Sequence, residues 1–224
     1  MTTVRHKKFT SRLCLFAGNQ CCSMSNQTHS VHICQRVSVE RFVYSFDYAQ
    51  QIHIPSNSQQ VGPIYFLTPY KVVLFGVACE PANKMVIYLV PECPARGKGA
   101  NSVISYLHHF FDNFTFGEEE VWLRADNCTG QNKNHKMIAY LCYWVYAGLH
   151  RKITIAFWLV GHTKFYPDMG FRVFKRRFKV PDVSTLTDSA QCVHDSNPKA
   201  NMLFPQLIGN GNGNVQLAGK IWEM

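Results

Sequence analysis

The succession of apolar segments between residues 40 and 180 is the feature that most restricts what this chain can fold into. Some segments are rich in aromatic and β-branched residues and are bounded by turn-forming sequences, which predicts strands. Others repeat apolar residues at helical spacing, which predicts amphipathic helices. The predicted strands cover 41–54, 72–79, 85–90, 120–125 and 152–160, with a short additional strand at 63–67, and the predicted helices cover 103–114, 137–148 and 167–179.

This order predicts a mixed sheet in an α/β domain. Three early strands with short connections favour antiparallel pairing. The later strands are separated by helices, which favours parallel crossovers. We therefore expect the order β-β-β-α-β-α-β-α with helices on the faces of the sheet, which is similar to the ribonuclease H-like plan. This domain is assigned to residues 40–180, between an irregular segment at 1–39 and a polar segment at 181–224 that is partly loop or disordered.

The charge balance indicates a polyanionic partner. The chain has 23 Lys and Arg against 14 Asp and Glu, a formal charge of +9, and DNA is the partner we expect. No apolar run approaches the roughly 18 to 20 residues of a membrane span, so no membrane association is expected. Nine cysteines without an export signal favour a nuclear or other intracellular location over secretion. Homo-oligomer formation stays open.

Three aspartates stand out among the acidic residues. Asp47 lies inside the first predicted strand, where a carboxylate is costly unless it is paired or binds a metal. Asp126 ends an apolar strand, and Asp168 begins the third predicted helix after the last strand. Ligands usually bind at the carboxyl ends of strands in such sheets, so we expect these three side chains to converge.

Three converging carboxylates would not all ionise stably without a cation. Mg²⁺ and Mn²⁺ prefer oxygen ligands, so either ion suits this set. Two such ions can activate a water or a 3′-hydroxyl and stabilise the leaving oxygen of a phosphodiester. The sequence therefore predicts a two-metal site for phosphoryl transfer.

Each aspartate also has a simpler interpretation. Asp47 could pair with a buried Arg or Lys, Asp126 could belong only to a strand-to-helix loop with a cap, and Asp168 could be an acidic residue in a helix first turn. Glu80 and Glu92 are interpreted as acids at hairpin ends. Either glutamate could replace Asp168 as the third ligand.

Three segments carry a resemblance to a known family. Residues 44–51, 125–134 and 161–168 are similar to the three blocks of an uncharacterised, transposon-derived domain family of animal genomes. The most specific block is Asp-Asn-Cys-Thr-Gly-Gln-Asn-Lys-Asn, which begins at Asp126. The layout resembles ribonuclease H-like transposases with an Asp-Asp-Asp/Glu triad, and it covers roughly residues 40 to 190.

The resemblance implies a transposase-like, metal-dependent phosphoryl transfer or hydrolysis on DNA. It also implies that Asp47, Asp126 and Asp168 are the metal ligands. The alternative is a domesticated or decayed copy that binds nucleic acid or another protein without catalysis. The residues that the resemblance marks as site neighbours are Gln50, Asn127, Gln131, Asn132, Lys133, His162 and Lys164.

Other side chains have two interpretations each. His162 could assist proton transfer beside the metals or be a hydrogen-bonded structural residue. Cys128 with His162 could form a thiol nucleophile and base, but no oxyanion site or orienting group accompanies them. The third predicted helix has a basic face that either contacts phosphates or is simply solvated. That face consists of Arg172, Lys175, Arg176, Arg177 and Lys179.

Overall fold

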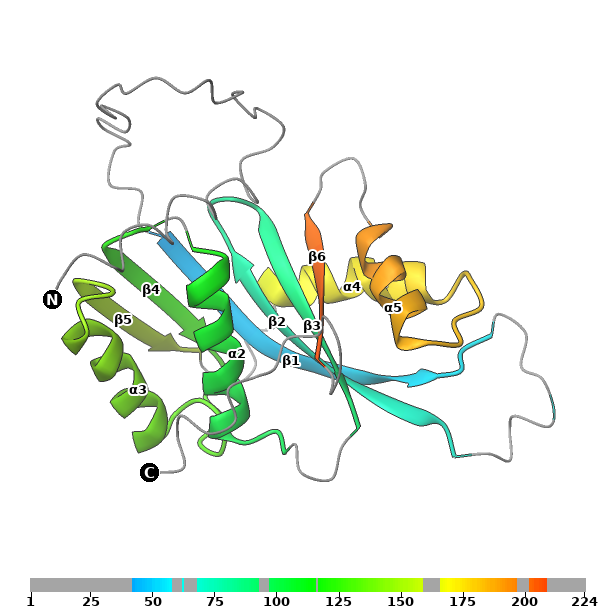
Figure 1. Cartoon of the computed structure of the whole chain (residues 1–224), viewed down its shortest axis with the longest axis horizontal. Coiled ribbons are helices and arrows are strands. Elements are labelled where there is room, and N and C mark those ends of the chain that lie inside the picture. Colours follow the sequence, from blue (N-terminus) through cyan, green and yellow to red (C-terminus); the bar gives the residue numbers. More distant parts are fainter. Residues whose placement is uncertain are drawn as a thin grey trace, which may run out of the picture.

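The computed structural model is an α/β domain with a six-stranded mixed sheet (Figure 1). It describes residues 42–57, 62, 68–92, 97–115, 117–158, 166–196 and 202–208. The strands are β1 (Phe42–Ile54), β2 (Tyr70–Cys79), β3 (Lys84–Pro91), β4 (Glu120–Ala125), β5 (Lys152–Phe157) and β6 (Leu203–Leu207). The helices are α2 (Ala100–Asn113), α3 (His135–Tyr146), α4 (Tyr166–Phe178) and α5 (Leu186–His194).

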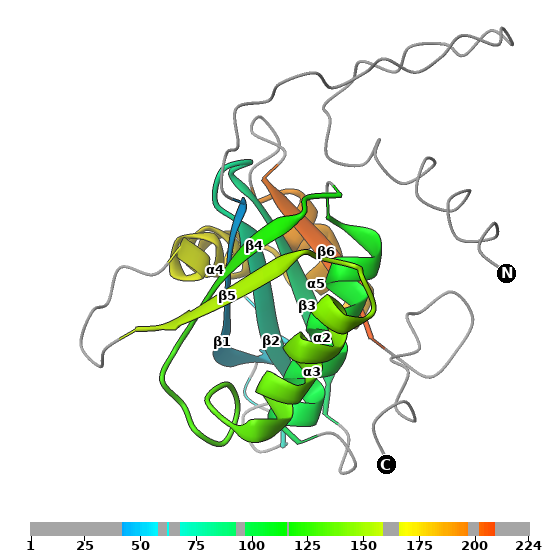
Figure 2. The ribbon, with the colours of Figure 1, turned by 90° about the vertical axis from the view of Figure 1, so that its left-hand side faces the viewer.

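The strand order across the sheet is β5-β4-β1-β2-β3-β6. β2 runs antiparallel to both of its neighbours, β1 and β3. β4 is parallel to β1 and to β5, and β6 is parallel to β3. β4 and β5 lie at one side of the sheet (Figure 2). The short early connections and the helical later ones account for this mixture of directions.

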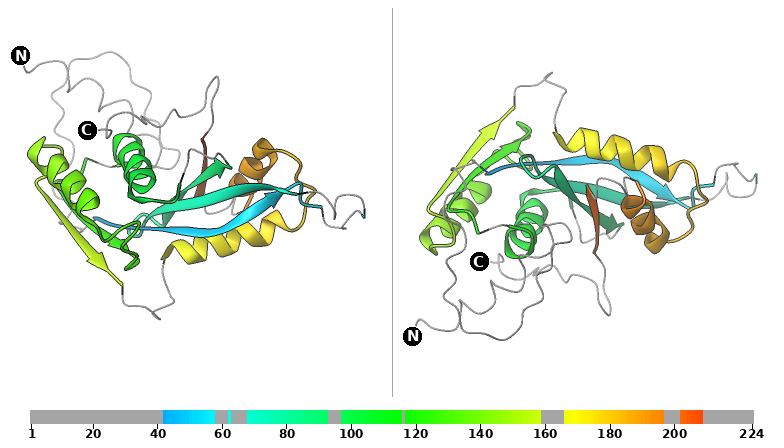
Figure 3. Two further views of the ribbon diagram at one scale, coloured as in Figure 1. Left: turned by 90° about the horizontal axis from the view of Figure 1, so that it is seen from below. Right: turned by 90° about the horizontal axis from the view of Figure 1, so that it is seen from above.

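Apolar cores cover both faces of the sheet. α2 and α3 lie on one side of β1, and α4 lies on the other (Figure 3). The first core joins alternate residues of β1 and β4, such as Phe46 and Leu123, to α2 and α3. The second core joins side chains on the other face of the sheet, such as Leu74 of β2 and Ile87 of β3, to α4 and α5. Side chains of neighbouring strand residues therefore point into different environments.

Two glycines let α4 approach the sheet closely. A Cβ atom at Gly76 would lie 2.1 Å from Cε of Met85 and 2.7 Å from Cζ of Phe171. A Cβ atom at Gly170 would lie 2.3 Å from Sδ of the same methionine, which is fully buried. Since Gly76 is the β2 partner of Asp47, α4 packs directly beside that aspartate.

Two elements lie in the range 181–224, which the sequence predicts to be polar and partly loop. α5 begins with a capping box in which the Thr185 hydroxyl accepts from the Asp188 amide, and the Asp188 side chain accepts from the Thr185 amide. β6 adds a sixth strand next to β3. The strand expected at 63–67 falls outside the described residues. Among the helices of the described segments, none is both long and apolar enough to span a membrane.

Candidate functional site

Strand register brings Asp47 and Asp126 together. Ser45 on β1 is the parallel partner of Arg124 on β4. Asp47 lies two residues after Ser45, and Asp126 lies two residues after Arg124. On β1, Tyr44 and Phe46 enter the first core, so Asp47 points toward the face covered by α4. Leu123 and Ala125 enter the same core from β4, and the alternation turns Asp126 to the face of Asp47.

Asp168 reaches this face from α4. It lies in the first turn of that helix and is exposed. Its negative charge contributes to the raised pKa of Asp47, as does the charge of Asp126. The charges of Asp126, which directly follows β4, and of Asp168 on α4 therefore both act on the Asp47 carboxyl of β1.

The electrostatics of the cluster are unfavourable for three ionised carboxylates. Burial is the main cause that raises the pKa of Asp47, from 3.8 to about 7. The Tyr48 amide donates to Oδ1 of Asp47 at 2.7 Å and opposes this shift, while the charges of Asp126 and Asp168 add to it. The balance leaves the Asp47 carboxyl close to half protonated at neutral pH.

Among the described residues, no Lys or Arg forms an ion pair of 4.0 Å or less with Asp47, Asp126 or Asp168. The nearby Arg124 is engaged elsewhere, because its Nη1 lies 2.8 Å from Oε2 of Glu80. The pairing of Asp47 with a buried Arg or Lys, which the sequence left open, is therefore not observed in this part of the chain.

Glu80 is held by residues on the same face of the sheet. Its carboxylate accepts from the hydroxyl of Ser45, which is completely buried, and from Arg124. The Arg124 guanidinium also lies 5.8 Å from the ring centroid of Trp158. We name this arrangement the Ser45–Glu80–Arg124 clamp. The clamp joins β1, the end of β2 and β4. Ser45 lies two residues before Asp47, and Arg124 lies two residues before Asp126.

The loop after Asp126 orients that carboxylate. Oδ1 of Asp126 accepts from the Cys128 amide at 3.3 Å and from Nδ2 of Asn132, whose side chain is almost fully buried. The Oδ1 atoms of Asn127 and Asn132 are buried and have no hydrogen-bond partner among the described residues. Asn134 caps α3 by accepting from the Met137 amide at 3.0 Å. Asn134 therefore supplies the cap of α3, while Asp126 accepts two hydrogen bonds from the loop itself.

The donor chemistry of this region fits a hard divalent cation. Carboxylate oxygens and unpartnered amide oxygens are ligands that Mg²⁺ and Mn²⁺ prefer. In the described part of the chain, however, no three Asp, Glu, His or Cys side chains are grouped closely enough to hold one ion together. Mg²⁺ commonly uses only one or two protein carboxylates and takes its other ligands from water and substrate phosphates. Asp47 and Asp126 on neighbouring strands meet that smaller requirement.

The alternative third acids are each engaged by other side chains. Glu80 is engaged in the clamp, and Glu92 pairs with Lys71. Neither of them contributes to the pKa shift of Asp47, whereas Asp168 does.

The remaining predicted neighbours are scattered. Gln50 is exposed on β1, three residues beyond Asp47. Gln131 lies in the loop after Asp126, and the ammonium of Lys133 lies 5.9 Å from the ring centroid of Phe157. Lys175 and Arg176 line a groove with Asp168. His162 and Lys164 fall outside the described residues.

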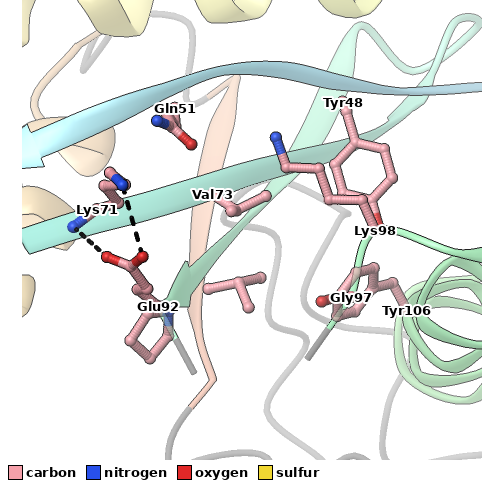
Figure 4. A pocket seen from close by; sticks show the side chains of 10 residues that line it. Tyr48, Gln51, Lys71, Val73, Glu92, Gly97, Lys98 and Tyr106 are labelled. Carbon is pink, nitrogen blue, oxygen red and sulfur yellow. Dashed lines mark hydrogen bonds and ion pairs between the residues drawn. The ribbon is translucent and has the colours of Figure 1, made fainter. Parts of the chain in front are cut away.

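A second, smaller cavity of about 160 Å³ lies on the α2 side of the sheet (Figure 4). The ammonium of Lys71 lies 3.7 Å from the Glu92 carboxylate there, and Lys98 lies 6.0 Å from the ring centroid of Tyr48. The Tyr48 hydroxyl is buried without a hydrogen-bond partner among the described residues. Because Tyr48 follows Asp47 directly and points the opposite way, the sheet separates this cavity from the aspartates.

Sequence reasoning missed the clamp and the close packing of α4. The only local signal for the clamp is Arg124, a charged residue in β4 at a position whose side chain does not enter the first core. Nothing local indicates its partner, because Glu80 lies 44 residues away. Gly76 carries an equally weak signal. A single glycine in an apolar strand indicates that another segment approaches closely, but it does not identify that segment.

Comparison with known proteins adds one match. A family model described as a domain of unknown function (DUF7869) matches residues 67–207. The matched range includes Asp126, Asp168 and the loop between β4 and α3, whereas Asp47 precedes it. No curated protein and no solved structure matches the chain significantly.

Proposed function

We propose that this chain, which belongs to the DUF7869 family of domains of unknown function, transfers or hydrolyses phosphodiester bonds of DNA. Asp47, Asp126 and Asp168 would hold the divalent ions. The observation that supports the proposal is the strand register that turns Asp47 and Asp126 to one face, where the charge of Asp168 on α4 also acts on Asp47 and none of the three has an ion pair in the described ranges. Such a cluster is stable as an ionised set only when a cation joins it.

Each residue has a definable task in this proposal. Asp47 and Asp126 supply oxygen ligands, and the Tyr48 amide and the Asn132 side chain orient them. Arg124 stays paired to Glu80, so it does not compete for the aspartates. When bound, Mg²⁺ or Mn²⁺ would lower the pKa of an attacking water and stabilise the leaving oxygen. Water or a 3′-hydroxyl is then the nucleophile, and the phosphodiester oxygen is the leaving group.

The sheet supports the ribonuclease H-like interpretation. β1, β2 and β3 are antiparallel, while β1, β4 and β5 are parallel, and Asp47 lies on β1 while Asp126 directly follows the neighbouring parallel strand β4. β6 is an addition to that plan. A transposase-like origin rests on the similarity of the three sequence blocks, and action on DNA would place the protein in the nucleus.

One observation favours a second candidate function. The described residues do not group three metal-ligating side chains tightly enough for one ion. A domesticated copy that binds nucleic acid without cleaving it is compatible with that spacing. The two candidates differ in whether Mn²⁺ or Mg²⁺ produces turnover.

The test is nicking and strand transfer on supercoiled and oligonucleotide DNA, with Mg²⁺, with Mn²⁺ and with EDTA. We expect metal-dependent cleavage by the parent and a loss of at least about a hundredfold in Asp47→Asn and Asp126→Asn. Glu92→Gln is the matched control, because Glu92 is an acid of the other sheet face. Metal-independent cleavage, or equal activity in Asp126→Asn, would refute the assignment. Binding without cleavage would favour the second candidate.

A further inference from the structure

An open groove of about 600 Å³ runs between β1 and α4, beside the aspartate cluster. Cations of α4 form its wall, and Gln50 lies on the opposite side. The polar residues that line it are Gln50, Asp168, Arg172, Lys175, Arg176 and Lys179.

The four cations of this groove form one stripe. Arg172, Lys175 and Arg176 occupy positions i, i+3 and i+4 on one face of α4, and Lys179 follows directly after the last helical residue and lines the same groove. Within the described ranges none of them makes an ion pair of 4.0 Å or less. Asp168 is the only acid among the lining residues, so the groove is strongly positive.

We propose that this groove binds the phosphodiester backbone of a nucleic acid and guides it to the aspartate cluster. The inference rests on the proposed function, and it adds the path and the mode of recognition of the substrate. Arg172 and Arg176 would each bind a phosphate through two parallel hydrogen bonds, and Lys175 and Lys179 would act as point charges.

The length of the stripe favours a polymer over a small anion. From Arg172 to Phe178, where α4 ends, the helical rise is roughly 9 Å, and Lys179 directly follows. A free phosphate would occupy only one or two of the four cations. A nucleic-acid backbone, with its regularly repeated charges, would engage all of them and continue past Asp168.

We expect the groove to contact the phosphodiester backbone and not the bases. It offers no free aromatic face for stacking, because Phe171 is only 4% exposed. The ring of Tyr48 packs against Phe75, at 4.9 Å between centroids, on the far side of the sheet. We therefore expect little base preference, since base recognition needs contacts to base edges or faces.

Arg177 provides a matched control on the same helix. It is exposed but does not line the groove. Burial raises the pKa of Cys192, and the positive charge of Arg177 opposes this shift, which places the guanidinium toward α5. Arg177→Gln thus removes the same charge from a different face of α4.

The experiment measures binding of the full chain to fluorescent 20-nucleotide DNA by anisotropy, in EDTA, over a range of salt. One arm uses single strands and the other duplexes, which identifies the form of backbone that fits. The parent should show a steep linear fall of log affinity with log salt. We expect each of Arg172→Gln, Arg176→Gln and Lys179→Gln to reduce that slope by about 1, and the triple variant by about 3.

Arg177→Gln should leave the slope nearly unchanged, and circular dichroism should show that all variants fold like the parent. An equal effect of Arg177→Gln would mean that net charge alone drives binding, which overturns the groove. Unchanged binding by the triple variant would overturn it as well.

The groove and the proposed function fail in different ways. Asp126→Asn should bind DNA as the parent does and fail to cleave it. Groove-dependent binding by a parent that never cleaves would leave the groove standing and remove the proposed function. If the parent cleaves DNA but the groove substitutions do not change its binding, the proposed function stands and the groove is overturned.

Discussion

The Nη1 atom of Arg124 lies 2.8 Å from Oε2 of Glu80, on the sheet face that also carries Asp47 and Asp126. This ion pair explains why a cation so close in sequence to Asp126 does not form an ion pair with the aspartates, which have none among the described residues. It also makes the clamp an energetic feature of the fold, since Glu80 is only 21% exposed and depends on Arg124 and Ser45 for its hydrogen bonds.

Removing Arg124 should therefore destabilise the protein. Arg124→Ala leaves the partly buried Glu80 carboxylate short of a partner, and we expect a loss of about 1 to 3 kcal/mol in the free energy of unfolding. A double-mutant cycle with Glu80→Gln in urea titrations should give a coupling of about 1 kcal/mol or more. The exposed Lys71–Glu92 pair serves as control, with an expected coupling below about 0.5 kcal/mol. Equal couplings would contradict the special role of the clamp.

Asp47 should make the fold less stable as the pH rises. Its pKa is raised to about 7 in the folded protein, so the folded state holds a proton that the unfolded chain releases near pH 3.8. The contribution is fully present below about pH 4 and is lost as the pH rises through 7. In EDTA, Asp47→Asn should gain stability over the parent as the pH increases from 4 to 8, by at most about 4 kcal/mol.

The measurement is urea unfolding of both proteins at several pH values. Glu119→Gln, at a side chain that is 80% exposed, controls for the loss of one carboxylate. A stability difference between parent and Asp47→Asn that does not change with pH would rule out the raised pKa.

His150 should act in the opposite direction. It is buried between Phe111 and Trp144, and neither ring nitrogen has a hydrogen-bond partner in the described part of the chain. Burial lowers the pKa of its imidazole from 6.5 to about 4. The stability it contributes is present above pH 6.5 and is lost as the pH falls toward 4. His150→Phe should therefore tolerate acid better than the parent, with a relative gain of at most about 3 kcal/mol at pH 4 by chemical denaturation.

Between pH 4 and 6.5, Asp47 and His150 change the free energy of unfolding with pH in opposite directions, so the parent should show little net change from this pair. In each single variant, the pH dependence of the free energy of unfolding should be that of the residue that remains. Parallel profiles for both variants would show that neither pKa shift is present.

The contact of α4 with the sheet should be sensitive to one methyl group. In Gly170→Ala the new Cβ would meet the buried Met85 side chain at 2.3 Å, and overpacking of this kind costs about 1 to 3 kcal/mol. Met85→Ala should relieve the collision, so the double variant should be more stable than the sum of the single changes predicts. Gly130→Ala is the control, because nothing lies within 4 Å of its added Cβ. Thermal unfolding of the four proteins measures the coupling.

Local pattern identified much of the molecule. Period-two and period-3.6 repeats predicted β1, β4, α2 and α3 within a few residues, because one face of each element must be buried. The same patterns singled out Asp47 and Asp126, since a carboxylate within or just after an apolar strand stands out against its neighbours. Charge spacing alone also marked the basic face of α4.

Tertiary structure decided the rest. Only the parallel register of β1 with β4 turns Asp47 and Asp126 to one face at neighbouring positions, and only the packing of α4 over Gly76 brings the charge of Asp168 to Asp47. The clamp between Ser45, Glu80 and Arg124 and the addition of β6 to β3 likewise join distant residues. Periodicity reports which face of an element is buried, whereas the identity of what covers that face depends on long-range contacts that no local pattern contains.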